Sequence, residues 1–226
     1  MFFRLSPCIG LVTPDLNKAS RFYREGMGMS LESYEEGMEL IAGPLHLFLD
    51  PGPKGSVVFE LLTPDLETAK AKLKFYGFEI ITWSGVGKAN LVRDPFDIVF
   101  NVFEYGEDDV IDLNVDENGK YRPLIGAIAP QIAPLAEFYS MVLQQPANRL
   151  ADGSYIVSGG EISLRFRSGD SEGPIIWMSH GTSLQDLIES GCDADPSDDH
   201  LVTDPFGIRW VVETRPESTH AVVNPL

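Results

Sequence analysis

The hydrophobic pattern of the chain repeats one local arrangement, an apolar run followed by an amphipathic segment with helical spacing. In the first copy, residues 8–12 predict a strand. Asp15 is a typical helix N-cap residue, and the apolar positions after it recur every three or four residues, as on a helix with one buried face. Gly26 then ends the helix. Alternating residues at 30–34, 39–42 and 45–49 predict antiparallel strands.

Three further copies of this arrangement follow. Their first strands are expected at 57–62, 124–129 and 175–178. Their helices are predicted by N-cap residues and by apolar stripes that share the spacing of three or four. The second copy has cap Asp65 and stripe Leu66, Ala69, Leu73 and Tyr76; the third has Ile132, Leu135, Phe138 and Val142; the fourth has cap Thr182 or Ser183 and stripe Leu184, Leu187 and Ile188.

Identical short motifs show that these copies arose by duplication. The sequence Thr-Pro-Asp-Leu occurs at 13–16 and 63–66, Ile-Gly at 9–10 and 125–126, and Phe-Tyr at 22–23 and 138–139. A turn, Asp-Pro-Phe, occurs at 94–96 and 204–206, where Asp97 or Gly207 can take the position with φ > 0. We therefore predict two halves, each made of two related modules.

The predicted fold class is α+β, with four βαβββ-type modules, curved and mostly antiparallel sheets, and helices on the outer face. The first domain is expected at 1–105, with modules near 7–52 and 55–105. Residues 106–122 are acidic and rich in turn residues, which is typical of a linker. The second domain is expected at 123–215 and a tail at 216–226.

Composition narrows the classes of function. The formal net charge of −17 argues against a nucleic-acid or anionic-membrane surface, because phosphates would be repelled. Two cysteines, Cys8 and Cys192, do not form a disulfide framework, and no apolar run reaches membrane-spanning length. We expect a cytoplasmic protein that binds a small molecule, with no nucleic-acid or membrane partner and with a homodimer as an open alternative.

The duplicated modules resemble the vicinal oxygen chelate superfamily, which includes glyoxalases, extradiol dioxygenases and bleomycin-resistance-type binding proteins. The resemblance rests on residues 8–15, on Arg21-Phe22-Tyr23-Arg24 with Gly26-Met27-Gly28-Met29, and on the two Asp-Pro-Phe turns. It covers nearly the whole chain apart from the expected linker and tail. It implies that each half forms a cup with a pocket on its concave sheet face.

Members of that superfamily that depend on a metal hold a divalent ion with His, Gln or Glu from the first and last strands of paired modules. Counting from the repeats gives the corresponding positions here. The first half offers Cys8, His46, Val58 and Asn101, and the second half offers Leu124, Ser163, Ile176 and Val211. The second set cannot bind a cation, and the first is too poor in ligands for a zinc site, which usually needs three. We therefore expect no metal and no cofactor.

A shift of two residues in the register would replace Val58 by Glu60, which points to the same face, and would give a more credible cation site. Each of these residues also has an ordinary structural explanation. Cys8 in an apolar strand is typical of a small buried hydrophobe, and His46 is as typical of a satisfied inward histidine as of a functional one. Both explanations stay open.

Strand alternation predicts the lining of each cup. In the first half the candidate pocket residues are Cys8, His46, Phe48, Glu60, Asn101 and Phe103, with Gly10 and Val99 on the same face. In the second half the same parity gives Ser163, Arg165, Met178, Arg209, Val211 and Glu213. Arg165 and Arg209 could clamp an anion, since a guanidinium matches a carboxylate or phosphate. Alternatively, Arg165, Arg167 and Glu213 form ion pairs on a sheet face, and the second half only supports the first.

These observations favour a metal-free protein that sequesters a small, partly apolar molecule in the first cup. The alternative is an enzyme of the same superfamily: a lyase or isomerase, either metal-dependent or using His46 and Glu60 as base and acid, or a dioxygenase. A third possibility is a role in assembly, since duplicated halves and sheet edges lend themselves to pairing. The sequence identifies no catalytic residue.

Overall fold

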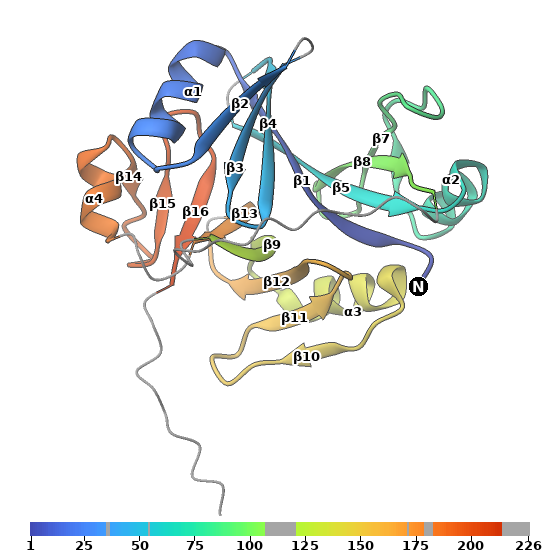
Figure 1. The fold of residues 1–226 in the computed structure, drawn as a ribbon. Helices are drawn as coiled ribbons and strands as arrows, with labels where there is room; N and C mark the ends of the chain where they lie inside the picture. Colours follow the sequence, from blue (N-terminus) through green and yellow to red (C-terminus); the bar gives the residue numbers. More distant parts are fainter. Residues whose placement is uncertain (35–36, 54, 107–120, 171, 179–182, 214–226) are drawn as a thin grey trace, which may run out of the picture.

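The computed structural model describes residues 1–34, 37–53, 55–106, 121–170, 172–178 and 183–213. Most of the expected linker and the whole expected tail lie outside these residues. The chain forms four βαβββ-type modules, as the sequence predicts (Figure 1). The helices are α1 (Leu16–Glu25), α2 (Leu66–Phe75), α3 (Ile132–Leu143) and α4 (Leu184–Glu189).

The strands of the described residues form two eight-stranded mixed sheets, one in each half. The first sheet has the order β2 (Ser30–Tyr34), β3 (Gly37–Ala42), β4 (Leu45–Pro51), β1 (Arg4–Thr13), β5 (Ser56–Thr63), β8 (Val99–Glu104), β7 (Leu91–Arg93) and β6 (Glu79–Ile80). The second has the order β10 (Ala147–Arg149), β11 (Tyr155–Ser158), β12 (Ser163–Ser168), β9 (Tyr121–Ala129), β13 (Gly173–Met178), β16 (Arg209–Val212), β15 (Leu201–Thr203) and β14 (Asp193–Ala194). The matching order confirms the duplicated architecture.

Local chemistry sets the helix starts as expected. The side chain of Asp15 accepts a hydrogen bond from the backbone N–H of Lys18, and Asp65 accepts one from Thr68. These caps satisfy backbone donors that a helix N-terminus leaves without an intrahelical partner. In α4 the cap is Ser183, one of the two residues that the sequence left open. The Asp-Pro-Phe turns also form as predicted, with φ of 64° at Asp97 and 88° at Gly207.

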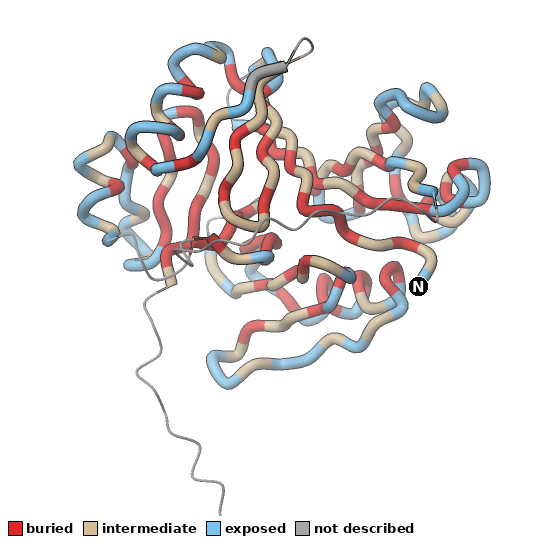
Figure 2. The backbone as a smooth tube through the Cα atoms, viewed as in Figure 1, coloured by how far each residue is buried: buried red, intermediate tan, exposed pale blue. Residues whose placement is uncertain are grey.

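Helices α1 and α3 lie between the two halves and join their cores. One buried cluster contains apolar residues of both sheets and all four helices. Buried positions alternate with partly exposed ones along much of β1, β4 and β5 (Figure 2). The ring of Phe22 on α1 meets Phe206 of the second half at 5.7 Å, and Phe138 on α3 meets Phe96 of the first half at 5.5 Å. The repeated Phe-Tyr pair therefore packs on the Asp-Pro-Phe turn of the opposite half.

Candidate functional site

The concave face of the first sheet carries a row of polar side chains across four adjacent strands. Cys8 on β1 pairs with His46 on β4, and Glu60 on β5 pairs with Asn101 on β8. The strands β1 and β5 are themselves neighbours in the sheet, so the two pairs lie side by side. Val58 pairs instead with Val99, so the residue that shares the row with Asn101 is Glu60. The count from the repeats was wrong there by two residues.

A cavity of about 740 Å³ lies over this row. Its size is within the range of small-molecule pockets, and most of its lining is apolar. Its lining residues are Cys8, Ile9, Gly10, Val12, Phe48, Asp50, Val58, Phe59, Glu60, Gly87, Lys88, Ala89, Leu91, Asn101 and Phe103. Five of the six residues predicted from sequence therefore line one cavity.

The sixth predicted residue, His46, is engaged elsewhere. Its Nδ1 atom forms a short contact with the carboxylate of Glu39 on the adjacent strand β3, and both side chains are mostly buried. Glu39 was not among the sequence candidates. It lies two residues before Ile41, which pairs with His46, so the two side chains are diagonal neighbours on one face.

Glu60 is the polar centre of the cavity. Its Oε2 atom accepts a hydrogen bond of 3.2 Å from the Asn101 side chain, and the Ser6 and Cys8 side chains also contact its carboxyl group. Burial raises the pKa of Glu60, and these hydrogen bonds oppose part of that rise. Burial, and next to it the Glu60 charge, raise the pKa of Cys8 to about 12. The Cys8 thiol is therefore protonated at neutral pH and is not an activated nucleophile.

An irregular segment, residues 84–89, forms one wall of the cavity and is held by Asn90. The buried Asn90 side chain accepts hydrogen bonds of 2.9 Å from the backbone N–H groups of Ser84 and Gly85. It donates at 3.0 to 3.1 Å to the carbonyl groups of Gly85, Lys88 and Val102. Its own backbone N–H donates to Oδ1 of Asn101 at 3.0 Å. Asn101 thus connects this wall to Glu60.

The residues of the row do not fit the divalent ion that the superfamily resemblance implies. Among the described residues, no group of three or more His, Cys, Asp or Glu side chains is placed to hold a metal ion. His46 does not line the cavity with Glu60, and an Asn amide is a weak ligand. We therefore derive no chemistry through a metal at this site.

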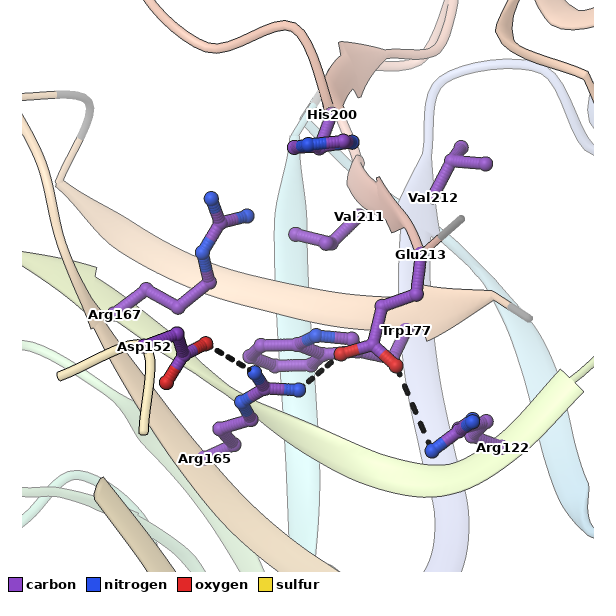
Figure 3. Close-up of a pocket in the computed structure, with 9 residues that line it drawn as sticks. All are labelled: Arg122, Asp152, Arg165, Arg167, Trp177, His200, Val211, Val212 and Glu213. Carbon is purple, nitrogen blue, oxygen red and sulfur yellow. Dashed lines mark hydrogen bonds and ion pairs between the residues drawn. The ribbon is translucent and has the colours of Figure 1, made fainter. Parts of the chain in front are cut away.

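The second half holds a smaller cavity of about 360 Å³, and its floor is occupied by Trp177 (Figure 3). Leu124, Trp177 and Val211 form a buried apolar cluster on the concave side. Arg165 lies 5.8 Å from the centroid of the Trp177 ring and is paired with both Asp152 and Glu213. Arg122 also pairs with Glu213, at 3.5 Å. The charged side chains of this cup are therefore paired with one another.

Two sequence predictions for this half are wrong. Met178 belongs to the core shared by both halves, whereas Trp177 faces the cup. The register of β13 against β9 shifts between Ile176 and Met178, and the apolar run offers no polar residue that would reveal which positions face inward. The sequence places Ile176 beside Val211 among the positions that correspond to metal ligands. In the structure Trp177, and not Ile176, pairs with Val211.

The two arginines of the predicted anion clamp have different surroundings. Arg165 lines the second cavity, whereas Arg209 donates to the backbone carbonyl of Pro174 at 3.3 Å. The ion-pair alternative describes Arg165 and Glu213 correctly, and Arg167 pairs with Asp198 at 3.0 Å.

Sequence reasoning missed Trp177, Asp152 and His200 in the second cavity. In the first cavity it missed Asp50, although Asp50 shares the parity of Phe48, and it missed Lys88 because irregular segments carry no periodic signal.

Solved structures share this architecture at low sequence identity. The Mn(II)-bound glyoxalase from Novosphingobium aromaticivorans is 12% identical with a TM-score of 0.61, covering 93% of this chain and 82% of its own. An extradiol ring-cleaving dioxygenase from B. fuscum is 16% identical with a TM-score of 0.60, covering 99% and 75%. The 2,3-dioxygenase LapB from Pseudomonas sp. KL28 is 14% identical with a TM-score of 0.57, covering 99% and 96%.

Neither a protein-family profile nor a curated protein sequence matches the chain. The structural neighbours establish the fold, which is the two-domain vicinal oxygen chelate fold of glyoxalases and extradiol dioxygenases. Because one fold supports many activities, they do not establish what this chain does. No helix among the described residues is long and apolar enough to cross a membrane.

Proposed function

We propose that the first-half cup binds a small, partly apolar organic molecule and does so without a metal ion. The observation that carries this proposal is the cavity of about 740 Å³ built around Glu60, Cys8 and Asn101. Its walls supply apolar contact area, and Glu60 supplies a hydrogen-bond acceptor that orients the ligand. The second half packs against the first through α1 and α3, and the floor of its own smaller cup is Trp177.

The binding proposal is tested by thermal melts with a panel of small organic molecules, compared between the native chain and Val58→Phe. Val58 lines the cavity and is partly exposed, so the larger side chain fills space that a ligand would use. Met141→Phe adds a similar ring at an exposed position on α3 and is the matched control. Ligands that raise the Tm of the native chain and of the control, but not of Val58→Phe, would support the proposal. Equal Tm rises in all three proteins would place the binding elsewhere.

The metal-free part of the proposal is tested separately. Melts with Zn²⁺, Ni²⁺, Mn²⁺ and Fe²⁺ are expected to show no metal-specific rise in Tm, because the described residues place no group of three His, Cys, Asp or Glu side chains around one point. A rise that disappears in His46→Ala would contradict it.

A second candidate function is acid–base catalysis by a lyase or isomerase, with Glu60 as the base. It is favoured by the raised pKa of Glu60 inside a cavity, since such groups are frequent at catalytic sites. The test is hydrogen–deuterium exchange at activated C–H bonds of bound ligands, followed by NMR. Exchange that stops in Glu60→Gln while ligand binding persists would establish catalysis. Binding without exchange would leave sequestration as the function.

A further inference from the structure

The first cup has an uneven charge distribution. Its charged lining residues are Asp50, Glu60 and Lys88. Glu60 accepts hydrogen bonds from neutral groups, namely the Asn101 amide, the Ser6 hydroxyl and the Cys8 thiol. Within the described part of the chain, neither Glu60 nor Asp50 belongs to an ion pair. A carboxyl group in such an apolar cavity is more stable as an anion when a cation lies beside it.

The two carboxyl groups stand at different depths of the cup. Glu60 lies in the polar row with Cys8, whereas Asp50 pairs with Val12, four residues further along β1. The Asp50 side chain reaches back over Gly10, two residues from Cys8, since its Oδ2 atom lies 3.7 Å from where a Cβ atom of residue 10 would stand. Glu60 is partly buried and Asp50 is exposed, so one carboxyl lies deep in the cavity and the other at its rim. Lys88 is also exposed, on the segment 84–89.

Apolar surface lies between these two depths. Phe48 pairs with Gly10, midway between Cys8 and Val12 on β1, and Val58 faces it from β5. Gly10 itself has no side chain, and the Cβ atom of Val58 lies 3.3 Å from where one would begin. Phe103 and Leu91 complete the apolar lining on the β8 side. Aromatic faces attract organic cations as well as apolar groups.

From this arrangement we propose that the ligand of the first cup is an organic cation, with an ammonium or amidinium group at Glu60 and an apolar body along Phe48 and Val58. This inference rests on the proposed binding function and specifies its ligand class. A second cationic group nearer the rim would meet Asp50, which also lines the cavity. The net charge of −17 attracts cations to the molecule at long range and repels anions.

The experiment compares matched ligands that differ only in one group. Calorimetric titrations use series of phenylalkyl compounds of increasing chain length, each as the primary amine, the alcohol and the carboxylate. At low salt and neutral pH, the amine is expected to bind about tenfold or more tightly than the alcohol, because a hydrogen bond to a charged group is stronger than a neutral one. The carboxylate is expected to bind most weakly.

Three variants assign the preference to its residues. Glu60→Gln keeps the shape of the side chain and is expected to bring the amine to the affinity of the alcohol, with little change for the alcohol itself. Diamines are titrated beside the primary amines, and Asp50→Asn is expected to reduce only their affinity, because their second ammonium group would meet Asp50. Glu137→Gln removes one carboxylate from an exposed position on α3 and controls for the change in net charge.

The possible outcomes separate this inference from the proposed function. Loss of the amine preference in Glu60→Gln but not in Glu137→Gln would support it. Equal binding of amine and alcohol by the native chain would overturn the ligand class and leave the binding function intact. Failure of every chain length and head group to bind would overturn both. An amine preference that persists in Glu60→Gln would place the cation elsewhere and so overturn the assignment.

Discussion

The hydroxyl group of Tyr139 on α3 donates a hydrogen bond of 2.5 Å to the Asp94 carboxylate in the opposite half of the chain. The duplicate of this contact joins Tyr23 on α1 to Asp204 at 2.7 Å. The other oxygen of each aspartate accepts hydrogen bonds from the backbone of its own turn, at Phe96 and Ile98 or at Phe206 and Ile208. The repeated Phe-Tyr and Asp-Pro-Phe motifs therefore serve the packing between the halves. They do not form the lining of either cup.

The two contacts differ in one respect, which gives a first prediction. Asp204 also accepts a hydrogen bond of 2.9 Å from the Trp210 indole, whereas the residue equivalent to Trp210 is Phe100, which cannot donate. In Tyr139→Phe the buried Oδ2 of Asp94 loses the Tyr139 hydrogen bond, and we expect a loss of about 1–3 kcal/mol of unfolding free energy. Tyr23→Phe should cost less, about 0.5–1.5 kcal/mol. Urea unfolding of both variants measures the difference, and a larger loss in Tyr23→Phe would contradict the explanation.

A second prediction concerns the pH dependence of stability through Glu60. Burial raises its pKa in the folded state above the value in the unfolded chain, which is about 4.3. The protonated carboxyl therefore favours folding; this contribution is fully present below about pH 4.3 and is lost as the pH rises through the raised pKa. Relative to Glu60→Gln, the native chain should thus lose unfolding free energy between acidic and neutral pH. Urea melts of both proteins across this range measure it, and a constant difference would contradict the burial of this carboxyl.

Asn90 gives a third prediction, about the wall of the first cup. Asn90→Ala removes the side chain that bonds Ser84, Gly85, Lys88 and Val102, but keeps the backbone N–H that bonds Asn101. We expect a loss of about 1–3 kcal/mol of stability and faster amide hydrogen exchange at residues 84–89, since the freed groups must bond to water. Ser84→Ala alters the same segment without removing the Asn90 side chain and should leave exchange nearly unchanged. Equal exchange in Asn90→Ala and the native chain would show that other contacts hold the wall.

The repeated Ile-Gly motif gives a fourth prediction, because its two glycines have different surroundings. A Cβ atom at Gly126 would collide with the backbone of Arg165 on the paired strand β12, whereas at Gly10 it would meet the Val58 side chain at 3.3 Å. Gly126→Ala should therefore cost about 3 kcal/mol or more, as the two strands must separate. Gly10→Ala should cost about 1 kcal/mol or less and reduce the volume of the cup. Urea melts compare them, and equal losses would contradict the close approach at Gly126.

The sequence predicts the modules well because their signals are local. Asp15 and Asp65 mark helix starts, and the spacing of apolar residues after them identifies the buried faces. Most of the first cup follows from alternation along β1, β4 and β8. Alternation cannot decide whether Val58 or Glu60 lies in the polar row, because a shift of two residues keeps a side chain on the same face. Only the pairing of Glu60 with Asn101 decides it. The Asn90 network lies in an irregular segment, where no periodicity indicates which side chain is buried.

The reciprocal packing between the two halves is relevant to the evolutionary origin of the chain. Each half contributes one Phe-Tyr pair and one Asp-Pro-Phe turn, and each pair is received by the turn of the other half. An ancestor of half this length, carrying one of each, would have had both surfaces unpaired as a monomer and matched in a twofold dimer. Gene fusion would then have made that dimer covalent, and the two cups of one chain could then take different linings.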